Sequence, residues 1–266
     1  MLFRSDWILP YLPIDFGERR NEKDEVTASA KRYLAKNELM ILEMLKNTAD
    51  WSRPIYFALT IGPEQYMRME PYFRQDGVAY RVMPFNTDRH QKVDTDILYD
   101  NVMNKYEWGN LEQPDLYVDE NSIRMVRTFR LIFGRLAQEL VAEGDSARAE
   151  EVADPCLQVL PEYNIPYDFY SINDFADVYH RIGNIEKAND LYNKLAGISM
   201  RNLNWFSRLN NKQYVTILED VRRDLYYMQH ILYYFSENDK DAFERYAKEY
   251  EQHMQQIGRA SCRERV

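Results

Sequence analysis

The hydrophobic and polar positions in the second half of the chain repeat with the period of an α-helix. From about residue 122 onward, apolar residues recur every three or four positions, which gives each segment one face to bury. Gly144, Pro161 and Gly183 interrupt this pattern, and Asn210 and Asn238 lie in weaker breaks. The pattern predicts helices over residues 122–143, 146–160, 172–182, 185–203, 208–236 and 238–256.

This helical part contains an internal repeat. Gly144 and Gly183 are 39 positions apart, and each is followed five positions later by an alanine, Ala149 or Ala188. A glycine lets the first helix of a pair end in a left-handed turn, and a small residue lets the second helix pack closely. Tetratricopeptide-type hairpins have this arrangement with a period of about 34 residues, although Pro155 falls where a helix should be uninterrupted. A tetratricopeptide-like stack and a generic helical bundle both remain possible.

The first part of the chain mixes short segments of different period. Residues 27–46 show helical spacing, with Asn37 as a possible start of a second helix. Residues 55–60 and 78–83 are rich in β-forming residues, and 64–74 between them predict a short helix. This succession predicts a small α/β unit with two strands paired in parallel. One face of the strand region is expected to be buried and consists of Trp51, Ile55, Phe57, Val78, Tyr80 and Val82.

The fold class expected is therefore mainly α, a small α/β unit with two short strands followed by tetratricopeptide-like hairpins. Residues 85–120 are polar and rich in turn formers, which is typical of a boundary. The two ends resemble translated sequencing adapters, so we interpret the chain as a piece of a longer protein. The expected organisation is an adapter-like segment 1–5, an α/β region 6–110, a helical-repeat region 111–256 and an adapter-like segment 257–266.

Charge and hydropathy narrow the function classes. The 266 residues carry 34 lysines and arginines against 43 aspartates and glutamates, a net charge of −9. This acidic balance argues against a general binder of nucleic acids or anionic membranes. The longest run without a charged residue, 225–236, is shorter than the roughly 20 apolar residues that cross a bilayer. Its tyrosines either form a stacking or membrane-contact surface or, in the interpretation we favour, lie at the rim of a packed core.

No catalytic, cofactor-binding or metal-ligating residue is assigned from the sequence. The four histidines lie far apart, so they predict no metal site. Asp94, Asp96 and Asp100 resemble part of a calcium loop but lack its glycine and terminal glutamate, which favours a helix start instead. Cys156 lies in an apolar stretch, which favours a packed thiol over a nucleophile. The sequence thus predicts no cofactor and no enzyme activity in the chain itself.

Three segments carry a resemblance to a known family. They are residues 36–44, the stretch 51–58 with its RPIYF motif, and the stretch 77–84 with its GVAYR motif. Together they resemble the C-terminal region of large bacterial multi-pass membrane proteins that carry a domain of unknown function. These proteins are similar to type C glycosyltransferases and to the eukaryotic transmembrane protein O-mannosyltransferase. The similarity covers roughly residues 30–85.

This resemblance implies a parent protein that transfers a sugar from a lipid-linked donor on the non-cytoplasmic side of the inner membrane. The catalytic residues of the family lie in early membrane loops, so none can be placed in this chain. The chain is then a non-catalytic soluble tail on the periplasmic side, which serves acceptor recognition, docking or stabilisation. Its expected partners are the membrane half of the same parent chain and a protein or glycan acceptor, with no nucleic acid.

The sequence leaves open the role of two arginines and an alternative function of the chain. Arg53 and Arg81 either form structural ion pairs or bind a phosphate of a lipid-linked sugar. The alternative function is a free-standing tetratricopeptide-like scaffold that binds a protein segment in a groove near Arg130 and Tyr179. A soluble enzyme is the least favoured hypothesis because the chain offers no recognisable catalytic site.

Overall fold

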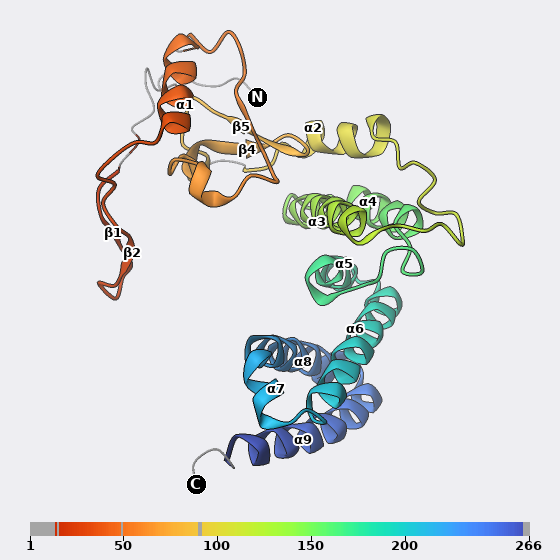
Figure 1. Cartoon of the computed structure of the whole chain (residues 1–266). Helices are drawn as coiled ribbons and strands as arrows, with labels where there is room; N and C mark the ends of the chain where they lie inside the picture. The colour runs from red at the N-terminus through yellow and green to blue at the C-terminus, as the bar shows by residue number, and fades with distance from the viewer. Residues whose placement is uncertain (1–13, 15, 49, 90–91, 263–266) are drawn as a thin grey trace. The chain divides into compact units, whose positions relative to one another are not determined.

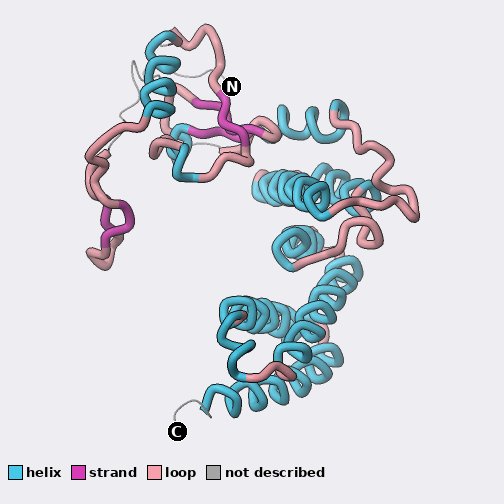
Figure 2. Tube along the Cα trace, in the orientation of Figure 1, coloured by secondary structure: helices cyan, strands magenta, loops and turns pink. Residues whose placement is uncertain are grey.

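The chain divides into two compact units, Met1–Tyr106 and Glu107–Val266. The computed structural model describes residues 14, 16–48, 50–89 and 92–262 (Figure 1). The adapter-like segment 1–5 and the last residues of 257–266 lie outside this described part. The mainly helical fold expected from the sequence is confirmed, and the strands of the described residues all lie in the first unit (Figure 2).

The second unit follows the predicted helices closely. The helices are α3 (Glu120–Ala142), α4 (Ser146–Val159), α5 (Phe169–Arg181), α6 (Ile185–Phe206), α7 (Asn211–Thr216), α8 (Leu218–Asn238) and α9 (Lys240–Cys262). The single helix predicted over 208–236 is wrong in one respect, because a break at Ile217 separates α7 from α8. The other predicted boundaries differ from the observed ones by a few residues.

Local capping explains where these helices begin. The side chains of Asp119, Asp145, Asp168 and Asn184 each accept hydrogen bonds from backbone N–H groups of the first helical turn. These N–H groups have no partner inside the helix, so an oxygen at the preceding residue satisfies them. The residue immediately before each hairpin helix therefore determines where that helix begins.

The two glycine turns of the repeat have the same conformation. Gly144 and Gly183 have φ values of +86° and +85°, and Ala149 and Ala188 are fully buried in the helices that follow. The hairpin α3–α4 is followed by the hairpin α5–α6, with α5 packed against both α3 and α6. Pro155 does not interrupt α4, which continues to Val159 because its neighbours Val152, Ala153 and Cys156 are buried in the core.

The first unit contains two small antiparallel sheets and little regular helix. β1 (Arg19–Arg20) pairs with β2 (Val26–Ala28). β3 (Tyr56–Ala58), β4 (Phe73–Gln75) and β5 (Ala79–Val82) form a sheet in the order β3-β5-β4. The helices are α1 (Lys36–Asn47) and α2 (Thr95–Asp100), the latter continued by a π-helical turn over Asn101–Lys105.

The predicted parallel pairing is wrong, because β5 is antiparallel to both of its neighbours. Parallel strands require a long crossover, usually a helix. Residues 64–74 do not supply one: they form short 3₁₀ turns and then β4, and Met67 and Arg68 have left-handed φ values of +52° and +60°. A tight turn through Gly77 then returns the chain directly as β5.

The helix predicted over 27–46 is also shorter than expected. α1 begins only at Lys36, with Ala35 at its N-cap rather than Asn37, and residues 29–35 are irregular and extended. The backbone N–H of Lys31 donates to the carbonyl of Phe16 at 2.8 Å. This long-range contact holds the segment away from helical geometry, which overrides its local helical spacing.

Aromatic residues form the core of the first unit. Phe57, Tyr66, Phe73 and Tyr80 lie with ring centroids 5.0 to 6.1 Å apart. Phe57 and Val82 are buried as predicted, whereas Val78 precedes β5 and is 45% exposed, contrary to prediction. Offset and edge-to-face ring pairs of this kind stabilise a small core beyond the area they bury.

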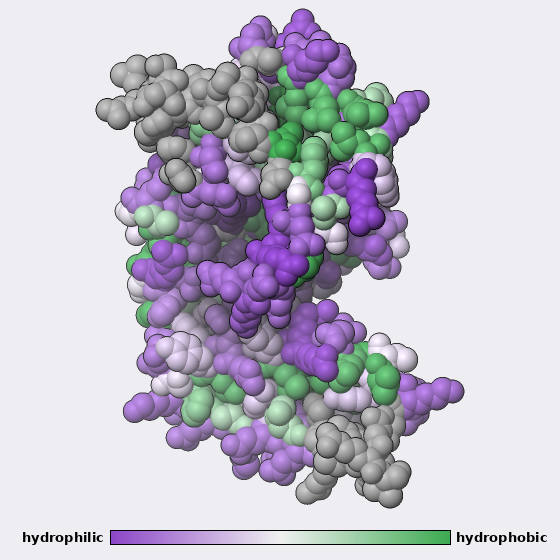
Figure 3. All heavy atoms as spheres, turned by 90° about the vertical axis from the view of Figure 1, so that its left-hand side faces the viewer, coloured by the Kyte–Doolittle hydropathy of each residue, from purple (hydrophilic) through white to green (hydrophobic). Residues whose placement is uncertain are grey.

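α1 presents apolar side chains on both of its faces. Ile41, Leu42 and Leu45 pack against the aromatic core, while Met40 and Met44 on the outer face are 58% and 50% exposed. Apolar surface is visible over the first unit in Figure 3. α1 is not apolar all round, because the charged Glu43 and Lys46 are exposed as well. Throughout the described residues, none of the helices combines the length and apolar character needed to span a bilayer.

Candidate functional site

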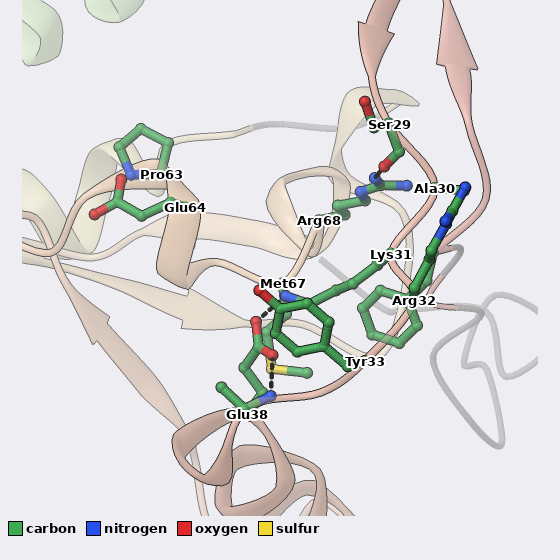
Figure 4. A pocket seen from close by; sticks show the side chains of 12 residues that line it. Ser29, Ala30, Lys31, Arg32, Tyr33, Glu38, Pro63, Glu64, Met67 and Arg68 are labelled. Carbon is green, nitrogen blue, oxygen red and sulfur yellow. Dashed lines mark hydrogen bonds and ion pairs between the residues drawn. The ribbon is translucent and has the colours of Figure 1, made fainter.

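The first unit contains a pocket of about 600 Å³ between the extended segment 29–35 and residues 63–68 (Figure 4). One end of Figure 4 shows Arg32 and the opposite end shows Pro63 and Glu64. Phe16, Tyr33 and Met67 supply apolar surface to the same pocket. The pocket therefore combines an apolar wall with charged groups of both signs.

Two cations of the pocket hold its walls together. The Nζ of Lys31 donates to Glu38, whose other carboxylate oxygen accepts from the backbone N–H of Ala35 at 2.7 Å. Both hydrogen bonds lower the pKa of Glu38, because they stabilise the charged carboxylate. The guanidinium of Arg68 donates to the carbonyl oxygens of Gly17 and Ser29. Lys31, Glu38 and Arg68 thus serve as a clasp that fixes the segment 29–35.

The remaining charged groups of the pocket are available for other contacts. Arg32 and Glu64 form no hydrogen bond or ion pair with the described part of the chain, and both are exposed. Tyr33 is 78% exposed beside Arg32. A concave, largely apolar surface with a few convergent polar groups is the usual form of a small-ligand site. The arrangement suits a neutral ligand with many hydroxyl groups, since Arg32 donates and Glu64 accepts.

Arg81, a ligand-binding candidate from the sequence, lies in a structural ion cluster. Its guanidinium is 3.9 Å from the carboxylate of Asp76, which also lies 3.2 Å from Arg74. Arg74 reaches Asp94 as well, at 3.1 Å. Burial raises the pKa of Asp76, while the two arginines act in the opposite direction. Arg53 is exposed before β3 and is not part of this cluster.

The acidic group that resembled a calcium loop is a helix start. The carboxylate of Asp94 accepts from the backbone N–H of Ile97 at 3.0 Å and caps α2. Among the residues that the structure describes, no three histidines, cysteines or acidic side chains are placed to hold a metal ion. Cys156 is fully buried, and burial raises the pKa of its thiol, so the packed-thiol interpretation is confirmed.

The groove predicted near Arg130 and Tyr179 is wrong, because both side chains are in the core of the second unit. Arg130 is fully buried and donates to the carbonyl oxygens of Leu160 at 2.7 Å and Pro166 at 3.1 Å, as well as to that of Ile165. The hydroxyl of Tyr179, 1% exposed, donates to Asp154. Both residues tie loops and helices together rather than facing a ligand.

The tyrosine-rich part of α8 is core-forming with an exposed rim, as the favoured interpretation predicted. Met228, Phe235 and Tyr234 are buried, whereas Tyr226 and Tyr233 are 64% and 67% exposed. The carboxylate of Asp224 at the other end of this helix is also buried. Helical spacing identified the apolar members, but it gave no signal for the buried carboxylate.

Sequence reasoning also missed the side chains that shape the pocket. Arg68, Arg32 and Glu64 belong to segments that were predicted as helices, in which their side chains would have been solvated. Their placement around one pocket depends on Arg68, whose guanidinium reaches the carbonyl oxygens of Gly17 and Ser29, 51 and 39 positions away. The spacing of apolar and polar residues over a few positions cannot predict such long-range contacts.

Residues 14–97 match the family model described as TMEM260-associated domain 2. The matched range contains the three-stranded sheet, α1 and all of the residues that line the pocket. It also contains the motifs at 53–57 and 77–81. Neither the curated proteins nor the solved structures gave a match to this chain.

Proposed function

We propose that this chain is the non-catalytic, periplasmic C-terminal region of a bacterial multi-pass membrane glycosyltransferase-like protein, where it recognises the acceptor. The match of residues 14–97 to TMEM260-associated domain 2 supports this proposal, because it covers the motifs that carry the resemblance to such proteins. The parent protein would lie in the inner membrane and transfer sugar from a lipid-linked donor. Its membrane half would be the main partner of this chain.

The pocket within the matched domain is the observation that carries the recognition role. A sugar ring presents hydroxyl groups at its edge and an apolar face of C–H groups. Arg32 and Glu64 offer a donor and an acceptor for the hydroxyls, and Tyr33, Phe16 and Met67 offer the matching apolar surface. A glycan carried by the acceptor therefore fits the pocket better than a charged phosphate, which would meet Glu64.

The same residues favour binding over catalysis. Sugar transfer and hydrolysis commonly use two carboxyl groups with distinct roles, one of them with a raised pKa. The pocket lining contains two carboxylates, and one of them, Glu38, is held by Lys31 with its pKa lowered. Glu64 is the other acidic side chain among the described residues of this lining, and it is exposed. The pocket thus supports a binding site in a protein whose chemistry occurs elsewhere.

The apolar outer face of α1 supports contact with the rest of the parent chain. Leu39, Met40 and Met44 are each at least half exposed, and they lie within the matched domain. Burial of such side chains against another surface stabilises the contact by roughly 1 kcal/mol or more each. We assign this face to the membrane half of the same chain.

Glycan binding by the purified chain tests the proposal. We expect a glycan array to show selective binding, and titration of the bound oligosaccharide to show at least tenfold weaker affinity for Arg32→Ala and Glu64→Gln. Lys36→Ala and Glu43→Gln are matched controls on the exposed side of α1, and they should change affinity less than twofold. Absence of any glycan binding at millimolar concentration would refute the recognition role, and sugar turnover by the purified chain would refute the non-catalytic assignment.

A further inference from the structure

The second unit contains a separate pocket of about 380 Å³ between the start of α5, the C-terminal half of α6 and α8. Its residues come from three helices that the glycine-turn repeat and the following α8 bring together. None of them lies in the segment that matches the known domain. The site is thus distinct from the pocket of the first unit in both sequence and structure.

An aromatic stack forms one side of this pocket. The rings of Phe169 and Tyr227 lie nearly parallel, with an interplanar angle of 9° and centroids 4.0 Å apart. Tyr170 beside them is 69% exposed. Flat aromatic surface of this kind packs well against the aliphatic part of a long side chain and attracts a cation near its face.

A buried carboxylate forms another side. Asp224 is 4% exposed, and its oxygens accept from the side-chain amide of Asn202 at 3.2 and 3.3 Å. The hydroxyl of Ser199 donates to the same carboxylate. Both of these partners are neutral, and burial raises the pKa of Asp224. A charged carboxylate in this setting lacks the paired cation that normally accompanies burial.

The charge of Arg223 on α8 lowers the pKa of Asp224, but Arg223 forms its ion pair with another residue. Arg223 lies at the pocket, but its guanidinium pairs with Asp220 at 2.6 Å and its side chain is 54% exposed. Arg127 pairs with Asp168 at 3.3 Å at the start of α5. The carboxylate of Asp224 therefore remains the group in this pocket that a cation from outside would satisfy.

The net negative charge of the second unit favours the binding of a cationic ligand. Residues 107–266 contain 19 lysines and arginines against 27 aspartates and glutamates, a net charge of −8. Residues 1–106 contain 15 against 16, a net charge of −1. Almost the whole net negative charge of the chain is thus on the second unit, where it raises the local concentration of basic ligands.

We infer that this pocket binds a lysine or arginine side chain of a partner polypeptide, with its cation at Asp224 and its aliphatic part against the Phe169–Tyr227 stack. The exposed Tyr170 lines the pocket, and the exposed Tyr226 beside Tyr227 extends the contact surface beyond it, which a polypeptide can use and a free amine cannot. The inference goes beyond the proposed function, because it concerns the other unit and requires no glycan.

Capture of peptide pools by the immobilised chain tests this inference. Each pool contains dodecapeptides randomised at every position except a fixed central lysine, arginine, glutamate or leucine. We expect the lysine or arginine pool to be captured at least tenfold more than the glutamate and leucine pools. Equal capture of all four pools, or no capture of any, would overturn the inference.

Matched variants assign the preference to the pocket. Asp224→Asn should remove it, whereas Glu219→Gln should leave it unchanged, because Glu219 loses the same charge on the exposed side of α8, where it pairs with Arg222. If circular dichroism shows that Asp224→Asn is unfolded, Tyr227→Leu provides the second variant and should reduce capture of the basic pools at least threefold. An unchanged basic preference in folded Asp224→Asn, or in Tyr227→Leu where Asp224→Asn is unfolded, would contradict the inference. Glycan binding in the first unit should be the same in all of them, so the two proposals fail independently.

Discussion

The two units of this chain reach their structures by different means. In the second unit, the residue that starts or ends a helix lies next to it, as Asp168 and Gly183 do. In the first unit, the extended segment 29–35 depends on Arg68, which reaches carbonyl oxygens of Gly17 and Ser29 many positions away. Local signals therefore suffice for a helical hairpin, while the pocket of the first unit exists only through long-range contacts.

The buried arginine of the second unit is an exception to this contrast, and its replacement should have the largest effect. Arg130→Met removes the N–H groups that donate to the carbonyl oxygens of Leu160, Ile165 and Pro166. We expect the free energy of unfolding to fall by about 3 kcal/mol, since buried acceptors lose their partners. Arg124→Met in the same helix removes only an exposed ion pair with Glu120. This substitution should change the free energy of unfolding by less than about 0.5 kcal/mol.

Urea denaturation of both variants measures this difference. Equal stability of the two would show that the loop over 160–167 is not held by Arg130 and that local signals alone are sufficient for the second unit.

Two glycines of the second unit should respond to the same substitution with opposite signs. Gly183→Ala places a side chain on a residue with φ of +85° and should destabilise the chain by about 1 kcal/mol, although no neighbouring atom is in the way. In Gly197→Ala, the new Cβ in α6 meets only the flexible end of Arg201 at 3.7 Å. This substitution should stabilise the folded chain by about 0.5–1 kcal/mol. Thermal unfolding checks both signs, and destabilisation by Gly197→Ala would contradict the local account.

The clasp of the first unit should show the smallest effect and a dependence on pH. The pKa of Glu38 is lowered in the folded chain, so its contact with Lys31 stabilises the clasp above the unfolded value of 4.5 and is lost as pH falls through the lowered value. Hydrogen exchange in residues 29–35 should be faster for Glu38→Gln than for the wild type at pH 7. The two should become equal once the pH falls below the lowered pKa of Glu38, where this carboxyl is protonated in the folded chain.

Glu43→Gln serves as the control for this measurement. Glu43 forms an exposed pair with Lys46 at 3.5 Å on α1, outside the pocket. A similar acceleration in this variant would show that the segment responds to net charge and not to the clasp.

These contrasts explain how much of the molecule was predictable from the sequence. Gly144, Gly183 and Asp94 were assigned correctly because their roles depend on residues within a few positions. The predictions of a helix over 27–46 and of parallel strands were wrong. Arg68 and the turn at Gly77 impose a backbone geometry that the spacing of nearby residues does not indicate. The pocket was missed for the same reason, and the buried Asp224 was hidden within a helix of ordinary pattern.

The complete reading frame that contains residues 6–256 tests the central claim most directly. The proposal that this chain is the periplasmic region of a membrane glycosyltransferase-like protein predicts several apolar stretches of about 20 residues upstream of the motifs at 53–57 and 77–81. Sequencing of the intact gene from its source would reveal them. A complete frame that encodes no such stretch would contradict the account.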